Sequence, residues 1–271
     1  MKKVILLQII CLMANIAAAQ NLAVQYTVSS TSIKDGKSKT EDTYVLVSDG
    51  QRSMFYNPEK WTVDSLMSTP DGKNAVLQQA MAQLAAGKPL KASAKGYYIC
   101  KNADGTITSY QDEPLIGKVF YTEPLGGLDW QLTGDSTKTV LGYECNTARC
   151  HYHGRTWNVL FTTDIPLQEG PWKLCGLPGV ILEAEADGGV YSFTATVIGM
   201  TNETIPEIVD KDQYDKTERI KFLKEKRDVT DHALERMNAR FGNVRVTSAD
   251  GRPITKINAS REVIDFIETD Y

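Results

Sequence analysis

Two of the three histidines in this chain of 271 residues lie two positions apart, on a segment that also carries a cysteine. Cys145, His151 and His153 are separated by even numbers of residues, so a regular β-strand would turn all three side chains to the same face. Thiolate and imidazole are ligands that copper and zinc favour in proteins. The spacing predicts a candidate copper or zinc site. The more ordinary interpretation is two solvent-facing histidines beside a turn and a disulfide-bonded cysteine, because the spacing fixes no third and fourth ligand.

Groups for bond-breaking chemistry are sparse. Glu183 and Glu185 would share one face of a strand, an arrangement that general acid–base catalysis can use. Leu182, Ala184 and Ala186 occupy the other face, so the acidic pair is more simply the solvated side of an amphipathic strand. The chain has no Gly-x-Ser-x-Gly elbow and no His-Glu-x-x-His motif. We therefore expect no catalytic residues, and a hydrolase ranks third among the possible functions.

The block from Gly170 to Gly179 contains three glycines and two prolines. Proline fixes φ and glycine permits positive φ, so the block sets a backbone shape and supplies no nucleophile, base or phosphate cradle. It is also unusually apolar for a loop. Its candidate ligand- or partner-binding residues are Trp172, Leu174, Leu177 and Pro178. The apolar side chains either plug the open end of a sheet, which we favour, or form a contact surface.

The elements around this block are mostly strands. Alternating apolar and polar residues predict antiparallel strands on both sides of a helical insertion over residues 57–87. The clearest hairpin joins residues 180–186 to 190–198 through Asp187-Gly188-Gly189. Residues 214–241 follow the periodicity of an amphipathic helix. The pattern predicts an α+β fold in which a curved, open, half-barrel-like antiparallel sheet packs against helices.

Several spaced motifs resemble the GLPGLI family of exported bacterial proteins. They are Ser53-Met54-Phe55, Asp129-Trp130, Gly142-Tyr143-Glu144-Cys145, Gly154-Arg155-Thr156-Trp157, Asp164-Ile165-Pro166 and Gly176-Leu177-Pro178-Gly179-Val180-Ile181. The stretch from Trp130 to Pro166 is also similar to envelope carriers of the LolA type. That second resemblance implies an open, curved antiparallel sheet, capped by helices, around an apolar cavity. The family resemblance implies export but no particular biochemical activity.

The first nineteen residues have the pattern of a secretory signal peptide. Lys2 and Lys3 precede an apolar stretch over residues 4–16, and Ala17-Ala18-Ala19 forms a small-residue cleavage site. The stretch is too short for a membrane span, and no second long apolar run follows it. We expect a periplasmic or extracellular protein that does not span the membrane. The net charge of −4, with both signs scattered, argues against nucleic acid as a partner.

Four cysteines follow the predicted cleavage site: Cys100, Cys145, Cys150 and Cys175. An even number in an oxidising compartment favours disulfide bonds, and three pairings are possible. Cys145 and Cys150 are separated by an odd number of residues, so in a regular strand they would face opposite sides and each would bond elsewhere. Buried free thiols are the alternative.

These patterns predict three regions: a signal peptide over residues 1–19, a sheet body over 20–204 and a charged, largely helical segment over 205–271. We expect non-catalytic binding of a hydrophobic small molecule or of a cell-envelope protein, through the face near the Gly-Pro-Trp loop. Binding of copper or zinc by Cys145, His151 and His153 is the alternative. No other cofactor is expected.

Overall fold

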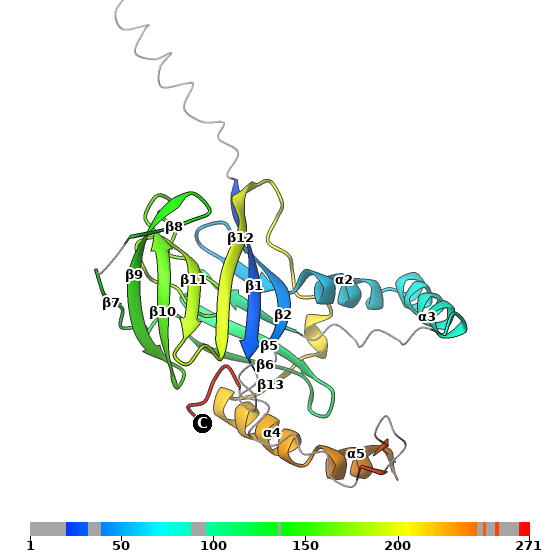
Figure 1. Ribbon diagram of the computed structural model, residues 1–271. Helices are drawn as coiled ribbons and strands as arrows, with labels where there is room; N and C mark the ends of the chain where they lie inside the picture. Colours follow the sequence, from blue (N-terminus) through cyan, green and yellow to red (C-terminus); the bar gives the residue numbers. More distant parts are fainter. Residues whose placement is uncertain are drawn as a thin grey trace, which may run out of the picture.

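One large β-sheet dominates the molecule (Figure 1). The computed structural model describes residues 20–31, 39–87, 96–134, 137–242, 246–247, 253–254 and 266–271. The predicted signal peptide lies outside these residues. Within them, thirteen strands form the sheet, and its two outermost strands are not paired with each other, so the sheet is open. The predicted α+β class, with a curved open sheet packed against helices, is confirmed.

The sheet is antiparallel apart from one parallel strand at its edge. Its strands are β1 (Asn21–Thr31), β2 (Lys39–Ser48), β3 (Ser53–Tyr56), β4 (Tyr97–Lys101), β5 (Thr106–Glu113), β6 (Gly117–Pro124), β7 (Gln131–Leu132), β8 (Lys138–Val140), β9 (Tyr143–Tyr152), β10 (Arg155–Thr162), β11 (Val180–Ala186), β12 (Tyr191–Thr201) and β13 (Asp215–Lys216). Their order is β13-β6-β5-β4-β3-β2-β1-β12-β11-β10-β9-β7, and β8 also pairs with β9. Strand β13 runs parallel to β6. Two short strands, β14 (Val246–Thr247) and β15 (Pro253–Ile254), pair separately.

Turn chemistry sets the strand boundaries. The predicted hairpin is confirmed: β11 and β12 are joined through Gly188 and Gly189, whose φ angles of 83° and 66° suit glycine. Between β2 and β3 the Asp49 carboxylate accepts hydrogen bonds from the backbone amides of Gln51 and Arg52, at 2.9 and 2.7 Å. Short local bonds of this kind reverse the chain and keep neighbouring strands in register.

The predicted helical insertion over residues 57–87 is two helices, α2 (Pro58–Met67) and α3 (Pro70–Ala85). Each begins with a proline in its first turn and a side-chain cap. The Asn57 side chain accepts from the Lys60 amide, and the Thr69 hydroxyl accepts from the Gly72 amide. The second cap explains why the segment is two helices rather than one.

The C-terminal segment also divides. Instead of one helix over residues 214–241, the structure has a short 3₁₀ turn (Lys211–Gln213), then α4 (Arg219–Asp231) and α5 (Ala233–Phe241). The backbone leaves helical geometry at His232, with φ −120° and ψ 31°. Buried Phe222 and Leu223 anchor α4, whereas α5 has no buried residue. Within the described residues, no helix has the length and hydropathy needed to cross a membrane.

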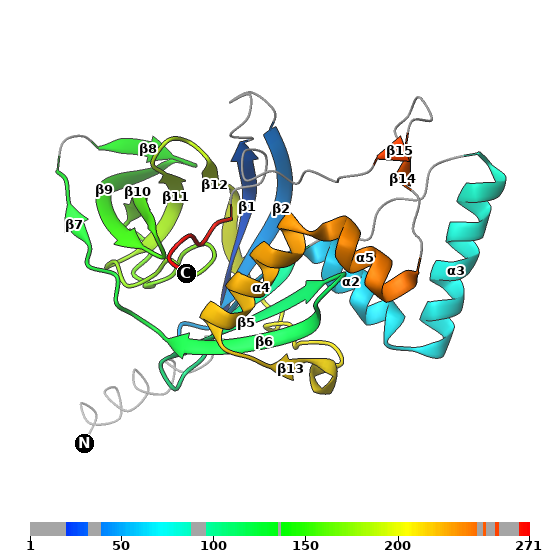
Figure 2. The ribbon, with the colours of Figure 1, turned by 90° about the horizontal axis from the view of Figure 1, so that it is seen from below.

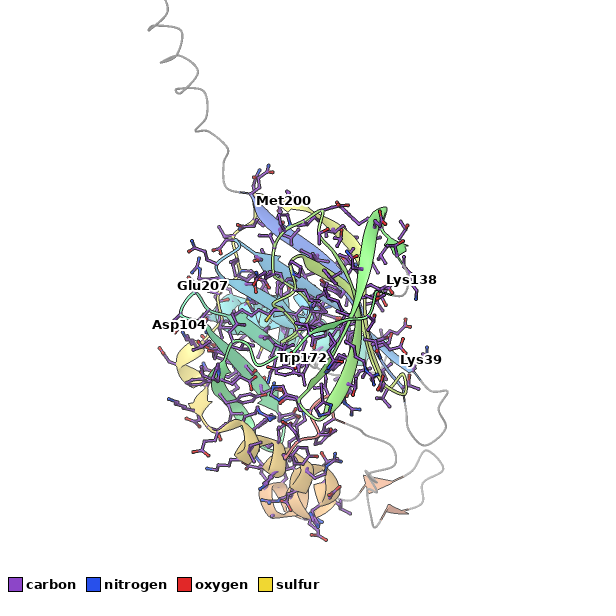
Figure 3. The ribbon with its side chains drawn as sticks, turned by 90° about the vertical axis from the view of Figure 1, so that its left-hand side faces the viewer. Lys39, Asp104, Lys138, Trp172, Met200 and Glu207 are labelled. Atoms are coloured by element: carbon purple, nitrogen blue, oxygen red, sulfur yellow. The ribbon has the colours of Figure 1, made fainter. Side chains whose placement is uncertain are left out.

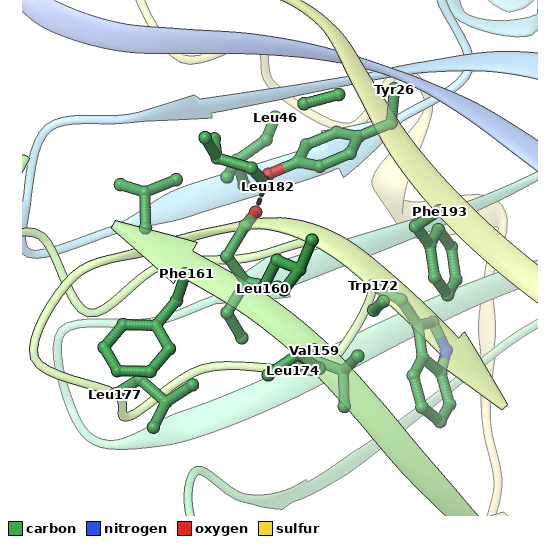
Figure 4. Packing of buried hydrophobic residues seen from close by; sticks show 14 of the residues in the cluster. Tyr26, Leu46, Val159, Leu160, Phe161, Trp172, Leu174, Leu177, Leu182 and Phe193 are labelled. Atoms are coloured by element: carbon green, nitrogen blue, oxygen red, sulfur yellow. Dashed lines mark hydrogen bonds between the residues drawn. The ribbon is translucent and has the colours of Figure 1, made fainter. Parts of the chain in front are cut away.

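The largest core covers one face of the sheet, which we call the inner face and define by Tyr26, Tyr44 and Phe193. Trp157 lies at its centre, with ring centroids 5.7 Å from Phe193 and 5.6 Å from Trp172. The buried Tyr26 hydroxyl donates to the carbonyl of Ile181 at 2.6 Å, which ties β1 to β11 (Figure 4). The side chains of the loop after β10 fill one part of this inner face.

The opposite face carries a smaller core around Met54, Tyr98 and Tyr110, next to α2 and the segment that precedes β13. Helix α3 projects from the body and leaves Leu77, Met81 and Leu84 exposed (Figures 1 and 2). The helices therefore contribute unequally, because α2 and α4 cover the sheet and α3 extends away from it.

Candidate ligand-binding site

A cavity of about 220 Å³ lies on the inner face of the sheet. Strands from both halves of the sheet line it, together with α4, the loop after β10 and the last residues of the chain. Its aromatic side chains are Tyr44, Tyr97, Tyr121, Trp172, Tyr191, Phe222 and Phe266. Such a concentration of rings around one small cavity is typical of pockets for apolar ligands.

The two-residue period of the strands also brings polar groups to this cavity. Asp42 and Tyr44 are two positions apart on β2 and therefore share a face. The antiparallel register places Asp42 opposite Val28 on β1, and Ser30 opposite Tyr191 on β12. All five residues line the cavity. Seven of the sixteen lining residues are thus aromatic, and six are polar or charged.

The tyrosine hydroxyls around the cavity are held in the protonated state. Burial raises the pKa of Tyr44, and the nearby charge of Asp42 raises it further. Burial likewise raises the pKa of Tyr97, with smaller contributions from Tyr44 and Tyr191. The rings of Tyr44 and Tyr97 lie 5.1 Å apart. A protonated phenol both donates and accepts hydrogen bonds, so these walls can orient a ligand as well as enclose it.

The C-terminal residues form one wall of the cavity and are bonded to two separate elements. The Thr269 amide donates to the carbonyl of His153 at 3.0 Å, and Arg155 Nε donates to the carbonyl of Ile267 at 3.0 Å. On the other side, Arg219 in α4 binds the Asp270 carboxylate. Figure 2 shows the C-terminus between the β9–β10 hairpin and α4. The wall therefore depends on a docked chain end.

Behind the cavity lies a buried network of charges centred on Lys173, which is fully buried. Its Nζ lies 2.5 Å from a carboxylate oxygen of Glu123 on β6 and 2.8 Å from one of Glu268. Arg219 Nη1 contacts the other oxygen of Glu268 at 2.8 Å. The Tyr121 hydroxyl, which donates to Glu268 at 3.2 Å, lines the cavity. The network joins the loop, β6, α4 and the chain end.

The charged states of this network follow from its geometry. Burial would raise the pKa of Glu123, but contact with the His153 ring and the Lys173 ammonium outweighs it and lowers the pKa to about 2. Burial alone would lower the pKa of Lys173. Its interactions with Tyr121, Glu268 and Glu123 outweigh that effect and raise the pKa. Lys173 and Glu123 are therefore both ionised at neutral pH, and the buried charges compensate each other.

A second buried lysine, Lys101 on β4, holds the other side of the loop. Its Nζ donates to the Glu169 carboxylate at 3.0 Å and to the carbonyls of Gly170 and Leu174 at 2.9 and 3.1 Å. Glu169 also accepts from the Ser48 and Ser53 hydroxyls, at 2.9 and 3.1 Å. The loop is thus fixed to the sheet on this side by a network whose side chains are all buried.

The four residues predicted for ligand or partner contact have different environments. Trp172 is buried and lines the cavity. Figure 3 shows its position inside the body of the molecule. Leu174 and Leu177 are buried in the core and do not border that cavity (Figure 4). Pro178 is exposed and borders a separate hollow of about 290 Å³ with Leu132. The loop therefore acts mainly as the plug that the sequence favoured.

The structure does not bring Cys145, His151 and His153 together. Cys145 is buried in the core, whereas His151 is exposed and contacts the Thr156 hydroxyl. Six residues of strand also place the Cys145 and His151 Cα atoms about 20 Å apart. His153 lies in the turn after β9, with φ 51°, and contacts Glu123. Cys145, His151 and His153 therefore do not form the metal site that their spacing predicted.

A different group of possible metal ligands does converge. Ligand atoms of His153, Glu268 and Asp270 lie within 4.8 Å of one another. Lys173 and Arg219 already bind the two carboxylates. The chemistry of the group is therefore that of an ion-pair network with its cations built in, and the chain end rather than a metal completes it.

The cysteine prediction also needs correction, since Cys100, Cys145, Cys150 and Cys175 are all free thiols in the structure. Cys145 and Cys150 do not face opposite sides, because both are buried in the inner core. The alternation of buried and exposed residues in β9 shifts by one between Cys145 and Ala148. The free, largely buried thiols match the alternative interpretation, in which cysteine packs as a small apolar residue.

The acidic pair of β11 behaves as the solvated side of a strand. Glu185 is exposed and Glu183 half-buried, while Leu182, Ala184 and Ala186 on the other face are buried. Neither carboxylate lines the inner-face cavity or the hollow beside Pro178. The pair therefore contributes nothing to the candidate site.

The sequence pattern did not indicate most of the cavity, including Asp42, Tyr97 and Glu268, or the Lys173 network behind it. One signal was present: Lys173 is the single charged residue in an otherwise uncharged apolar block from Gly170 to Gly179. A lysine that must be buried needs a buried counter-charge. The identity of that counter-charge could not be read from the local sequence.

Comparison with known proteins gives fold-level likenesses only. No family model matches the chain, and no curated protein matches it. Two crystal structures of PNGF-II are similar, with TM-scores of 0.48 and 0.47, identities of 15% and 16%, and 76% of this chain covered. The match covers 33% and 32% of those chains, so this chain spans about a third of PNGF-II.

A LolA superfamily protein from Nitrosomonas europaea is also distantly similar in structure. Its TM-score is 0.30 at 9% identity, over 72% of this chain and 92% of that one.

Proposed function

We propose that this protein is an exported, non-catalytic member of the GLPGLI family that binds a small hydrophobic ligand in the cavity of the inner face. The observation that carries the proposal is the convergence of seven aromatic side chains on one cavity of about 220 Å³. An engineered apolar cavity of about 150 Å³ already binds benzene. The cavity here suits one ring with a short chain attached.

Two of the charged groups around the cavity, Glu268 and Lys226, support binding rather than bond breaking. Glu268 is held by Lys173 and Arg219, and Lys226 is paired with Glu113 at 2.5 Å. A catalytic acid or base needs a free position toward its substrate. Both of these groups instead bind neighbouring side chains, and their role is to position the wall.

Binding of phenylbutanol, a neutral probe of suitable size, tests the proposal by isothermal titration calorimetry. Val28→Trp would fill the cavity, because Val28 lines it. Thr27→Trp is the matched control, because the neighbouring residue faces the other side of β1. We expect the wild type and Thr27→Trp to bind the probe, and Val28→Trp to lose at least tenfold in affinity. No binding by the wild type, or full binding by Val28→Trp, would contradict the proposal.

Export is tested separately, by expression of the full chain in a bacterium and N-terminal sequencing of the product. Cleavage after Ala19 would leave Gln20 as the first residue. Recovery of the product from the periplasm or medium with that terminus supports export. An uncleaved chain that stays inside the cell contradicts it, without bearing on the cavity.

A further inference from the structure

Asp42 is the charged residue of the cavity that has no partner. It lies on β2, exposed at the edge of the cavity, two residues before buried Tyr44 and opposite Val28. Among the residues that the structure describes, no hydrogen bond or ion pair reaches its carboxylate. Partial burial and the neighbouring charge of Glu59 raise its pKa. Among the described residues, the surroundings therefore supply negative potential, and no cation is paired with this carboxylate.

The other charges near the cavity are compensated. Glu268 binds two cations, and Lys226 binds Glu113 while lying 5.4 Å over the Phe266 ring. Arg155 stands 5.4 Å over the Tyr191 ring, and its guanidinium binds the carbonyl of Ile267. One carboxylate at the cavity edge thus remains for a ligand to neutralise.

The rings next to Asp42 suit a cation. The faces of aromatic rings attract ammonium groups, and Tyr44 and Tyr97 lie side by side with ring planes inclined by 33°. Burial, with a smaller contribution from the Asp42 charge, raises the pKa of both hydroxyls and keeps them neutral. An ammonium group at Asp42 would meet one negative charge and electron-rich rings together.

We infer that the cavity selects amines, with the ammonium group paired with Asp42 and an apolar body enclosed by the aromatic side chains. This inference rests on the proposed function and names the chemical class of its ligand. A carboxylate of the same shape would face Asp42 and be repelled, whereas a neutral alcohol would gain only the apolar contacts.

Three probes of one shape test the inference: phenylbutylamine, phenylbutanol and phenylbutyrate, titrated calorimetrically at neutral pH. We expect the wild type to bind the amine about tenfold more tightly than the alcohol, and the carboxylate most weakly. Asp42→Asn should abolish the preference for the amine and leave the affinity for the alcohol unchanged. Glu41→Gln is the matched control, because this adjacent exposed acid does not line the cavity. It should keep the preference.

The outcomes separate the inference from the function on which it rests. If the alcohol binds but the amine binds no better, the class assignment is wrong and the binding function stands. A preference for the amine that survives Asp42→Asn, or that is lost equally in Glu41→Gln, also overturns the assignment to Asp42. If none of the three probes binds, the proposed function itself fails. Thermal unfolding of each variant identifies any loss of fold.

Discussion

The loop between β10 and β11 is held by one buried lysine on each side, and the two attachments draw on different parts of the chain. On one side Lys101 uses all three ammonium protons within a closed set of partners, namely Glu169 and the carbonyls of Gly170 and Leu174. These partners belong to the loop itself, and the hydroxyls that complete the set come from β2 and β3. This attachment fixes the plug to the sheet.

On the other side Lys173 binds Glu123 from β6 and Glu268 from the chain end, and Arg219 extends the network into α4. The partners here lie far apart in sequence, and one of them forms the cavity wall. Buried ion pairs therefore have two different roles in this fold. The Lys101 network stabilises the body, and the Lys173 network ties that body to a docked segment that shapes the pocket.

Lys101→Met should produce the largest loss of stability. Among the described residues, it would leave the buried Glu169 carboxylate with only the Ser48 and Ser53 hydroxyls as donors and with no other cation in contact. Breaking a buried pair in this way costs about 4 kcal/mol in the free energy of unfolding, measured in urea. Lys138→Met, at an exposed position on β8, is the control and should stay within about 0.5 kcal/mol of the wild type. A loss below about 1 kcal/mol would show that this network is not structural.

Acidification should lower the free energy of unfolding, through the Lys173 network, by an amount similar to that lost in Lys101→Met. The pKa of Glu123 falls from 4.5 to about 2 on folding, so its ionisation stabilises the fold fully above pH 4.5. That contribution, about 3 kcal/mol, is lost as the pH falls from 4.5 through 2. We expect wild-type stability to decline over this range more steeply than that of Glu123→Gln, measured by urea unfolding at each pH. Parallel curves for the two proteins would contradict the assigned pKa.

Lys173→Met should cost less than Lys101→Met, although Lys173 is the more deeply buried. Arg219 remains in contact with Glu268 at 2.8 Å and with Glu123 at 3.5 Å, so the two carboxylates keep one cation. We expect a loss of about 2 kcal/mol in the free energy of unfolding. Hydrogen exchange at the Thr269 amide should also accelerate, because the chain end loses one of its ionic attachments. Equal losses in the two lysine variants would show that Arg219 does not compensate.

The strands and the helical insertion could be predicted because their signals are local. The turn residues Asp187-Gly188-Gly189 predict the β11–β12 hairpin, and Asn57 and Pro58 predict the start of α2. The alternation of side chains along a strand does not predict which face they occupy where the strand is irregular. In β9 the burial pattern shifts between Cys145 and Ala148, so residues assigned by parity to opposite faces share one core.

The candidate site could not be predicted in the same way. Lys173 and Glu268 are 95 residues apart in sequence, and nothing near either residue identifies the other. The lysine within an apolar block indicates that a counter-charge must exist, but only the path of the chain selects Glu268 and Glu123. Sequence periodicity determines which face a residue occupies, whereas a pocket between remote segments depends on how those segments dock.

Tyr271→Phe should have the smallest effect on stability. It removes one hydrogen bond, from Arg227 Nε to the Tyr271 hydroxyl at 2.7 Å, and keeps the ring beside Phe266. We expect a loss of about 1 kcal/mol in the stability of the docked chain end, seen as roughly fivefold faster exchange at the Thr269 amide. Tyr143→Phe, on β9, is the control and should not change that exchange. Because the Lys101 network shares no residue with the chain end, amides of β3 and β4 should exchange at wild-type rates in Tyr271→Phe. Acceleration in those strands would mean that the two attachments act as one cooperative unit and that the chain end cannot open while the plug stays fixed.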